Sequence, residues 1–186
     1  MFDASGIWID ILIFAAALVY ANLFEYAFHR WLMHRLHGLV KREHMLHHGI
    51  FRGDHRYHVL QSEDRHFILF EWWQGPSIIG GHLPAFWAIG AATGRPVWWL
   101  GSLALGVYYA AYEYLHWSMH NPCNRSVERT ALFRYLDRNH QLHHSQSHIN
   151  FNVVAPFGDL VFGTFRRTID TPGDQHSITP PSRVHS

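Results

Sequence analysis

Three long apolar segments limit what this chain can fold into, because such segments must be shielded from water. Residues 6–28 carry only Asp10 and Glu25 as charges, both near the ends. A helix of this length, at about 1.5 Å per residue, covers the ~30 Å hydrocarbon core of a bilayer. A secretory signal peptide is the alternative, but no basic region precedes the segment and no small-residue cleavage site follows it. We therefore expect a membrane helix here.

The other two apolar segments, residues 76–92 and 96–112, are separated only by residues 93–95. This arrangement predicts a helical hairpin in the membrane, extended by aromatic flanks. Pro84 falls inside the first arm and is expected to kink it. The sequence therefore predicts an all-α integral membrane protein with about three to four membrane helices.

Charge indicates how the chain is oriented. The net charge of +1 gives no reason to expect nucleic-acid binding. Residues 29–66 and 116–186 hold seven Lys and Arg each, so the positive-inside rule predicts both segments in the cytoplasm and the N-terminus outside. Arginine outnumbers lysine 14 to one, which favours a bacterial source and hence the bacterial inner membrane. We expect one domain over residues 1–170 and a loose tail over residues 171–186.

Histidines form the main functional pattern. Ten of the 18 fall into four clusters within the two predicted cytoplasmic segments, so that each segment carries a pair followed by a His-x-x-His-His triplet. With about one residue in ten a histidine, two such triplets arise by chance in only a few per cent of chains of this length. The clusters are His29 and His34; His44, His47 and His48; His116 and His120; and His140, His143 and His144.

Helical spacing predicts how these rings converge. Residues three and four apart share a helix face, so each triplet can direct its imidazoles at one point, as can His116 and His120. His29 and His34 are five apart, about 140° around an ideal helix. They need a local distortion, or they serve different metals.

The number of imidazoles exceeds the four ligands of a structural zinc site, so two metals with about five nitrogens each fit better. Imidazole suits several metals and leaves the element open. Cys123 is the only cysteine, which rules out a cysteine-built metal site. The predicted fold is thus a membrane bundle with a helical, histidine-rich cytoplasmic metal-binding cap.

Other polar residues are candidates for supporting roles. Glu25 and Glu113 precede His29 and His116 by four and three residues, a spacing that lets each carboxylate accept a hydrogen bond from the neighbouring ring. His82 lies in a membrane arm, where a polar group is costly and often functional. Ligand, supporting and surface roles remain open for His37, His55, His58, His66 and His148.

Together with residues 150–164, the four clusters resemble the fatty acid hydroxylase and sterol desaturase superfamily of membrane di-iron enzymes. The ending Asp159-Leu160-Val161-Phe162-Gly163-Thr164 is similar to the family's Asp-x-x-Phe-Gly-Thr motif. The family resemblance implies two non-haem iron ions held by the ten clustered histidines, with Asn150 and Asp159 as supporting residues. It also implies an oxidoreductase that activates O₂ and attacks an unactivated C–H bond of a fatty acyl or sterol-like lipid.

The sequence departs from the family pattern at two positions. Asn152 stands where the family often has glycine, and Gly158 where an aromatic residue often precedes the aspartate. No cytochrome b5 domain is fused to the chain, so the resemblance implies a separate electron donor, which is cytochrome b5-, ferredoxin- or reductase-like. Desaturation shares the first hydrogen abstraction with hydroxylation. The histidine spacing is also similar to that of carotenoid hydroxylases, although the Phe-Gly-Thr ending favours the fatty acid or sterol branch.

Rival functions rest on other residues. Glu63 with His66 and Glu113 with His116 fit the Glu-x-x-His motif of carboxylate-bridged di-iron bundles. A bis-His haem electron carrier would use His82 with His116 or His120, and a metal-handling membrane protein is a further alternative. Four tryptophans either line a substrate channel or form an interfacial belt: Trp72, Trp73, Trp98 and Trp99.

Overall fold

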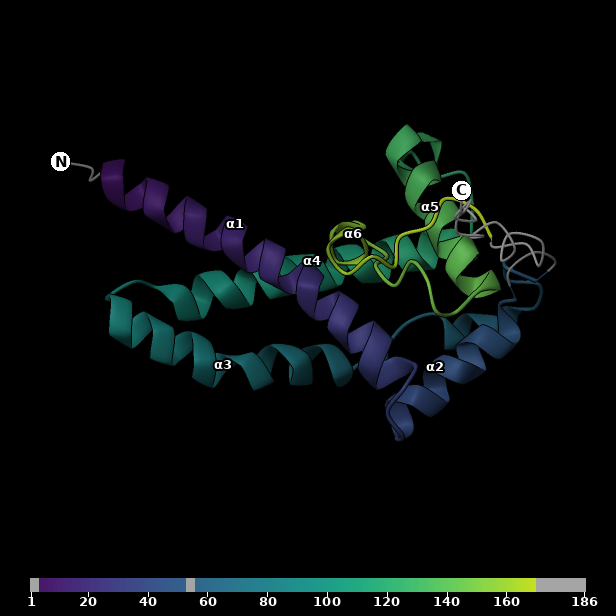
Figure 1. Ribbon diagram of the computed structural model, residues 1–186, viewed down its shortest axis with the longest axis horizontal. Helices are drawn as coiled ribbons and strands as arrows, with labels where there is room; N and C mark the ends of the chain where they lie inside the picture. The colour runs from purple at the N-terminus through teal and green to yellow at the C-terminus, as the bar shows by residue number, and fades with distance from the viewer. Residues whose placement is uncertain (1–3, 53–55, 170–186) are drawn as a thin grey trace, which may run out of the picture.

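The computed structural model describes residues 4–52 and 56–169, and its regular elements in these ranges are all helices. This confirms the predicted all-helical class for the part of the chain that is described. Three long helices, α1 (Ala4–Ala27), α3 (Gln74–Thr93) and α4 (Val97–His120), form one end of the molecule (Figure 1). The predicted tail over residues 171–186 lies outside the described residues, and the single domain over 1–170 stays a prediction.

Helices α3 and α4 form the predicted hairpin. Gly94 ends α3 in the left-handed conformation, with φ of 66°, which glycine adopts without a Cβ clash. α4 packs against both α3 and α1, around a core of Ala21, Phe86, Val97 and Leu105. Arg95 in the hairpin turn lies 3.7 Å from the Asp10 carboxylate of α1, so the hairpin turn and the beginning of α1 lie at the same end of the bundle.

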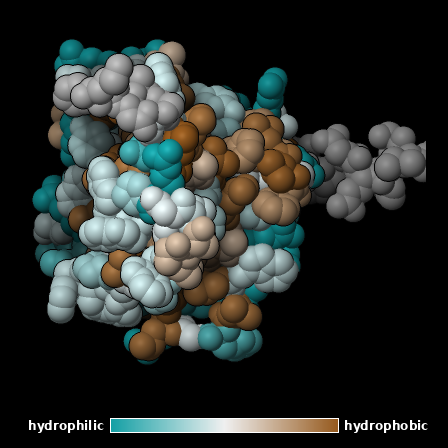
Figure 2. Space-filling model, turned by 90° about the vertical axis from the view of Figure 1, so that its left-hand side faces the viewer, coloured by the Kyte–Doolittle hydropathy of each residue, from teal (hydrophilic) through white to brown (hydrophobic). Residues whose placement is uncertain are grey.

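Among the described helices, only Gly6–Met33 is long and apolar enough to cross a bilayer by length and composition. The predicted number of three to four membrane helices is therefore not confirmed and stays a prediction. Large apolar side chains such as Trp8, Leu12 and Trp87 are about two-thirds exposed. Figure 2 looks onto the end that lies on the left of Figure 1, where apolar residues reach the surface beside hydrophilic ones.

The first apolar segment does not end as a plain α-helix. After Ala27 it continues as a π-helical segment, η1 (Phe28–Met33), before the chain turns. A π-helix forms i→i+5 hydrogen bonds in place of i→i+4, and it occurs mostly as a short insertion at functional sites. The predicted distortion near His29 is therefore present.

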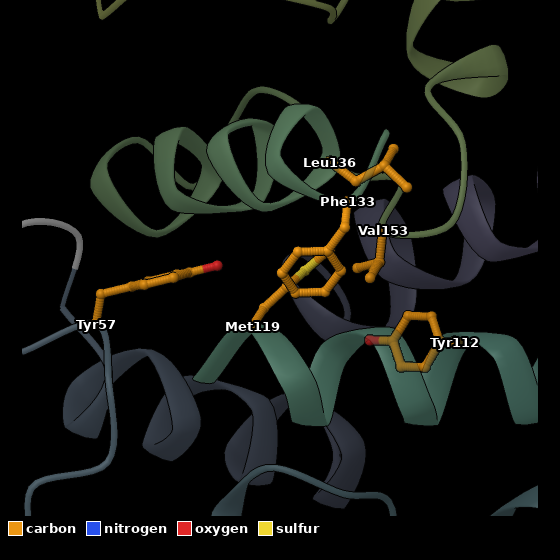
Figure 3. Packing of buried hydrophobic residues seen from close by; sticks show 6 residues of the cluster. All are labelled: Tyr57, Tyr112, Met119, Phe133, Leu136 and Val153. Atoms are coloured by element: carbon orange, nitrogen blue, oxygen red, sulfur yellow. The ribbon is translucent and has the colours of Figure 1, made fainter. Parts of the chain in front are cut away.

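The histidine-rich cap lies at the end of the bundle away from the N-terminus (Figure 1). It contains α2 (Leu39–Ile50), η2 (Ser62–Phe67), η3 (Val127–Arg129), α5 (Ala131–Ser145) and the short α6 (Phe157–Val161). The Thr130 hydroxyl caps α5 by accepting from the Phe133 backbone N–H at 3.1 Å. An apolar cluster joins α4 to α5 and the final loop: Tyr57, Tyr112, Met119, Phe133, Leu136 and Val153 (Figure 3).

Candidate metal centre

The structure brings the ten clustered histidines together as two groups of five. Within each group, one ring nitrogen per residue lies within 4.8 Å of all the others. The first group contains His29, His34, His44, His48 and His143. The second group contains His47, His116, His120, His140 and His144. Every ring in both groups is provided by a histidine that the sequence patterns selected.

Each triplet is divided between the two groups, so the prediction that a triplet converges on one point is wrong. In α2, His44 and His48 belong to the first group and His47 to the second. In α5, the middle histidine, His143, belongs to the first group, and the other two histidines of that triplet belong to the second. The reason is helix geometry: positions i and i+4 point about 40° apart, whereas i+3 and i+4 point about 100° apart. Adjacent rings therefore face different centres.

The first pair, His29 and His34, reaches a common centre through the π-helical turn. Their ring centroids lie 5.0 Å apart in a stacked arrangement, and both rings join the first group. Because a π-helix has more residues per turn, a spacing of five brings two side chains to the same face. The alternative that the pair serves different metals is wrong for this geometry. His116 and His120 share the second group from the end of α4, as their spacing of four predicts.

Backbone carbonyls fix the orientation of five of the ten rings. Nδ1 of His29 lies 2.5 Å from the Phe151 carbonyl oxygen, and Nδ1 of His143 lies 2.7 Å from that of Ile149. In the second group, Nδ1 of His47, His120 and His144 lies 2.8, 2.7 and 2.5 Å from the carbonyls of Phe67, Tyr57 and Phe51. A carbonyl only accepts, so each of these Nδ1 atoms carries the proton and leaves the Nε2 lone pair free in the neutral ring.

The Nε2 atoms face one another inside each group. In the first group, Nε2 of His44 lies 3.0 Å from those of His29, His34 and His48. In the second, Nε2 of His140 lies 3.1 Å from those of His120 and His144. In the second group, Nε2 of His47 lies 3.2 Å from Nε2 of His144, and because both of these rings donate from Nδ1 to a carbonyl, two lone pairs face each other and cannot satisfy each other. Nε2 of His116 is also buried without a hydrogen-bond partner. An electrophile at the centre of the group would accept these lone pairs.

The spacing of these nitrogens fits a metal ion. Imidazole nitrogens bind first-row metals at about 2.0–2.1 Å. Nitrogens at that distance from one point and at right angles to one another are about 3.0 Å apart, whereas tetrahedral ligands would be about 3.4 Å apart. The observed separations are 3.0–3.2 Å, so the donor sets fit a five- or six-coordinate ion better than a four-coordinate one.

Burial keeps the rings in the form that binds metal. Desolvation lowers the pKa of His34 and His47 to about 4, and that of His143 to about 3, with the neighbouring rings adding to the shift. The pKa values of His44, His48, His140 and His144 are also lowered by burial. Neutral imidazole is the ligand form, so the groups are ready to bind a cation at neutral pH without releasing protons.

The final loop supports the first group through Asp159. Its carboxylate accepts from the backbone N–H groups of Phe151 and Asn152 at 2.8 and 2.7 Å, and from the Thr164 hydroxyl at 2.6 Å. These bonds hold the Phe151 peptide, whose carbonyl in turn holds His29. Asn150, with φ of 50°, exchanges hydrogen bonds with the Arg166 backbone at 2.8 and 2.9 Å and so closes the same loop. Neither the Asp159 nor the Asn150 side chain belongs to one of the two groups of possible metal ligands.

Glu25 and Glu113 do not make the hydrogen bonds that their spacing predicted. The Glu25 carboxylate accepts from the Tyr108 hydroxyl at 2.5 Å, from Asn152 Nδ2 at 3.0 Å and from the Val153 N–H at 2.5 Å. Glu113 accepts from the Phe70 N–H at 3.4 Å. The expectation that each fixes a neighbouring histidine is therefore wrong, because the Nδ1 of His29 is already taken by a carbonyl and Glu25 is needed by the final loop.

The two departures from the family pattern compensate each other. A Cβ on Gly158 would lie 2.6 Å from Asn152 Oδ1 and 2.6 Å from the Cβ of Tyr26. The Asn152 side chain fills that space and accepts from the Asp159 N–H at 3.1 Å. The small residue at 158 thus makes room for the larger one at 152, and the path of the final loop is fixed.

The remaining described histidines lie outside the two groups. His37, His58, His66 and His148 are exposed, while His55 lies outside the described residues. His82 directs Nδ1 at the Ile78 carbonyl 2.6 Å away and packs edge-on against Tyr20 and Phe24. The groups contain no carboxylate, so the Glu-x-x-His pairs of Glu63 and Glu113 do not form a carboxylate-bridged site among the described residues.

The four tryptophans do not line one channel, although Trp73 lines a cavity with Phe28 and Ile78. Trp98 and Trp99 lie in the first turn of α4, at the opposite end from His116, and Trp72 is 84% exposed. Two cavities beside the histidine groups are lined by other aromatic residues, notably Phe28, Phe70 and Tyr112. The alternative that the tryptophans form an interfacial belt stays a prediction.

Over the described residues, fold and site together define an all-helical protein with two groups of histidines that could each hold a metal ion, next to a long apolar helix. That class agrees with the comparison to known families, in which the fatty acid hydroxylase model matches residues 14–164. The chain therefore belongs to the fatty acid hydroxylase family, within the fatty acid hydroxylase and sterol desaturase superfamily. Membership implies an oxidoreductase, and with the apolar helix it indicates membrane association. Comparisons with curated proteins and with solved structures found no match.

Proposed function

We propose that this protein is an integral-membrane, non-haem di-iron oxygenase that uses O₂ to hydroxylate a fatty acyl or sterol-like lipid. One observation carries the proposal: ten imidazoles form two sets of five, with nitrogen separations that fit two metal ions. Five nitrogens per ion leave one position of an octahedron for an exogenous ligand. Iron is the element that family membership favours.

The protein's own residues have three tasks in this reaction. The carbonyls of Phe51, Tyr57 and Phe67 hold the rings of the second group, and those of Ile149 and Phe151 hold rings of the first. Burial of these rings excludes water from the reacting atoms. The cavities beside His29 and His44 would position the substrate. When bound, the iron pair would supply O₂ activation and hydrogen abstraction.

Hydroxylation consumes electrons, which an electron donor must supply. Inserting one oxygen atom into a C–H bond and reducing the other to water takes two electrons and two protons in addition to O₂. We propose a separate donor that is cytochrome b5-, ferredoxin- or reductase-like. We also propose that the cap faces the cytoplasm of a bacterial inner membrane, with the N-terminus outside, because the cap segments hold nearly all of the positive charge.

Desaturation and carotenoid hydroxylation use the same kind of metal centre and are the alternatives within the proposal. The haem carrier is less favoured, because His116 and His120 are engaged in the second group and His82 contacts its own helix backbone. A metal-handling protein would need the histidines along a membrane path, whereas here they converge on two closed centres.

The decisive experiment is metal analysis with optical and Mössbauer spectra on iron-supplemented, detergent-purified protein. His143→Ala and His144→Ala each remove one ligand from a different group, so each should lower the iron content from about two to about one per chain. The double variant should lose nearly all iron. His148→Ala is the matched control and should keep both ions, because this exposed histidine follows soon after the second triplet and belongs to neither group.

The outcomes separate the candidate functions. About two irons per chain, no Soret band and one iron in each single variant would support the di-iron assignment. Oxygen-dependent lipid products should then be sought in membranes that contain the protein. A Soret band would favour the haem carrier, and iron content unchanged in both single variants would contradict the proposed ligand sets.

A further inference from the structure

Two of the cavities that border the histidine groups share part of their lining. The first, here called the cap cavity, has a volume of about 200 Å³ and lies between α2, the segment 66–71 and the end of α4. Its walls include His44 of the first group and His47 and His116 of the second. Because rings from both groups line it, a molecule in the cap cavity would lie next to both metal positions.

The second, here called the helix cavity, has a volume of about 60 Å³ and lies between α1, α3 and α4. It begins at His29 and Met33 and ends at Ala21 and Leu105, which belong to the core between the long helices. Most of its walls are apolar, and the carboxylate of Glu25, which also lines it, is engaged by Tyr108, Asn152 and Val153. The helix cavity therefore suits an uncharged hydrocarbon chain.

Phe70 and Tyr112 line both cavities and form the wall between them. Their rings are stacked, with centroids 5.4 Å apart and planes at 18°. The Phe70 ring also stacks on Tyr109 of α4 at 6.1 Å and meets Phe28 of η1 edge-on at 6.4 Å. A single side chain, Phe70, thus bridges η1 and α4.

The charges around the cap cavity limit which polar head it can accept. Glu43 and Glu71 line it, and no lysine or arginine is among its lining residues. Gln74 links Glu43 to Glu71, because its amide donates to the Glu43 carboxylate at 3.1 Å and accepts from the Glu71 backbone N–H at 3.1 Å. A carboxylate head would face like charge, whereas a hydroxyl, amide or amine could donate to these groups.

We propose that the two cavities form one substrate site for an amphipathic chain whose head carries hydrogen-bond donors rather than a carboxylate. The head lies in the cap cavity, the hydrocarbon chain enters the helix cavity past Phe70, and the carbons near the head lie beside the metal groups. Phe70 is the specificity-determining residue, since its ring sets how easily a chain reaches the helix cavity. The assignment rests on the proposed oxygenase function.

The test is photolabelling of the iron-loaded protein in lipid nanodiscs with diazirine-bearing alkyl probes of equal chain length. The three probes carry a hydroxyl, a primary ammonium or a carboxylate head, and the labelled residues are mapped by mass spectrometry. We expect the hydroxyl and ammonium probes to label Met33 and Leu105, and the carboxylate probe to label them about tenfold less. Glu43→Gln combined with Glu71→Gln should restore several-fold labelling by the carboxylate probe.

Phe70→Ala should increase labelling of the helix cavity severalfold, and Phe70→Trp should decrease it. Phe157→Ala removes an exposed ring that lines neither cavity and should change nothing. Equal labelling by all three heads, or labelling confined to other surfaces, would overturn the proposal. Probe binding requires no turnover, so this result is separate from iron content and oxygen-dependent product, which test the proposed function.

Discussion

The two histidine groups differ in how they are enclosed. All five rings of the second group are buried, whereas His34 in the first group is only half-buried. The first group also depends on a π-helical turn to bring His29 and His34 together, while His116 and His120 of the second lie on a regular α-helix. Two donor sets of the same composition are thus built with unequal protection from water.

The groups also differ in what holds their rings. Rings of the first group donate to carbonyls of the final loop, at Ile149 and Phe151. Rings of the second donate to carbonyls at Phe51, Tyr57 and Phe67, in the segment that follows α2. Changes in one supporting segment should therefore affect one group and spare the other.

The largest effect should come from replacing the middle histidine of a triplet with alanine. His47→Ala removes a ligand of the second group, although the other histidines of its triplet belong to the first group. The Mössbauer spectrum of His47→Ala should therefore match that of His140→Ala and differ from that of His44→Ala. We expect the affinity for the affected iron to fall by more than about 100-fold. Matching spectra for His47→Ala and His44→Ala would show that each triplet serves a single metal.

Asp159→Asn should weaken the first group selectively. The amide has one acceptor oxygen, so one of the backbone N–H groups of Phe151 and Asn152 loses its partner, at a cost of about 1–3 kcal/mol. The misplaced Phe151 carbonyl should lower iron affinity in the first group by about 10- to 100-fold. Iron titration followed by Mössbauer spectroscopy checks this, and equal loss from both groups would contradict the separate supports.

The sequence determined the donors of these sites better than their arrangement. All ten predicted histidines enter the two groups, because their spacing on α2, α4 and α5 follows directly from helix periodicity. The division of the triplets was missed, since it depends on two centres lying on either side of α2 and α5. The helical period of 3.6 residues gives the direction of each side chain around its own helix, but it does not give the positions of the neighbouring helices.

The supporting contacts could not have been predicted. The partners of His29, His47 and His143 are backbone carbonyls, which every residue carries and no side-chain pattern marks. Glu25 has the right spacing for a histidine partner but is drawn to the final loop, 127 and 128 residues further along the chain. Such long-range competition is invisible in local spacing. The five-residue gap between His29 and His34 was the one available signal for the π-helical turn.

The metal-free protein should lose stability as the pH falls. The pKa values of His34 and His47 are about 4 in the folded protein, below the ordinary value near 6.5, so between these values only the unfolded chain binds the protons. Stability is therefore complete above pH 6.5 and declines toward pH 4, by roughly 2 kcal/mol per ring between pH 7 and pH 5. Denaturant unfolding of the metal-free protein at these two pH values measures the change, and unchanged stability would contradict burial of the neutral rings.

The smallest expected difference concerns metal release. Because His34 is half-buried, a chelator should reach the first group sooner than the enclosed second group. We expect biphasic loss of iron with rates that differ severalfold, and His34→Ala should accelerate only the faster phase. Stopped-flow absorbance with a chromogenic chelator records both phases, and a single phase would indicate equal access to the two groups.

Each triplet contributes one histidine, His47 or His143, to the group formed mainly by the other half of the chain, and this has a consequence for biosynthesis. The first group lacks one ligand until His143 has been synthesised. The second group lacks two ligands until His140 and His144 have been synthesised. Neither half of the chain can therefore assemble a complete site while the ribosome is still making the other. Iron must enter late, after α2 and α5 have met, and once bound it would cross-link distant segments, such as those of His48 and His143, which are 95 residues apart.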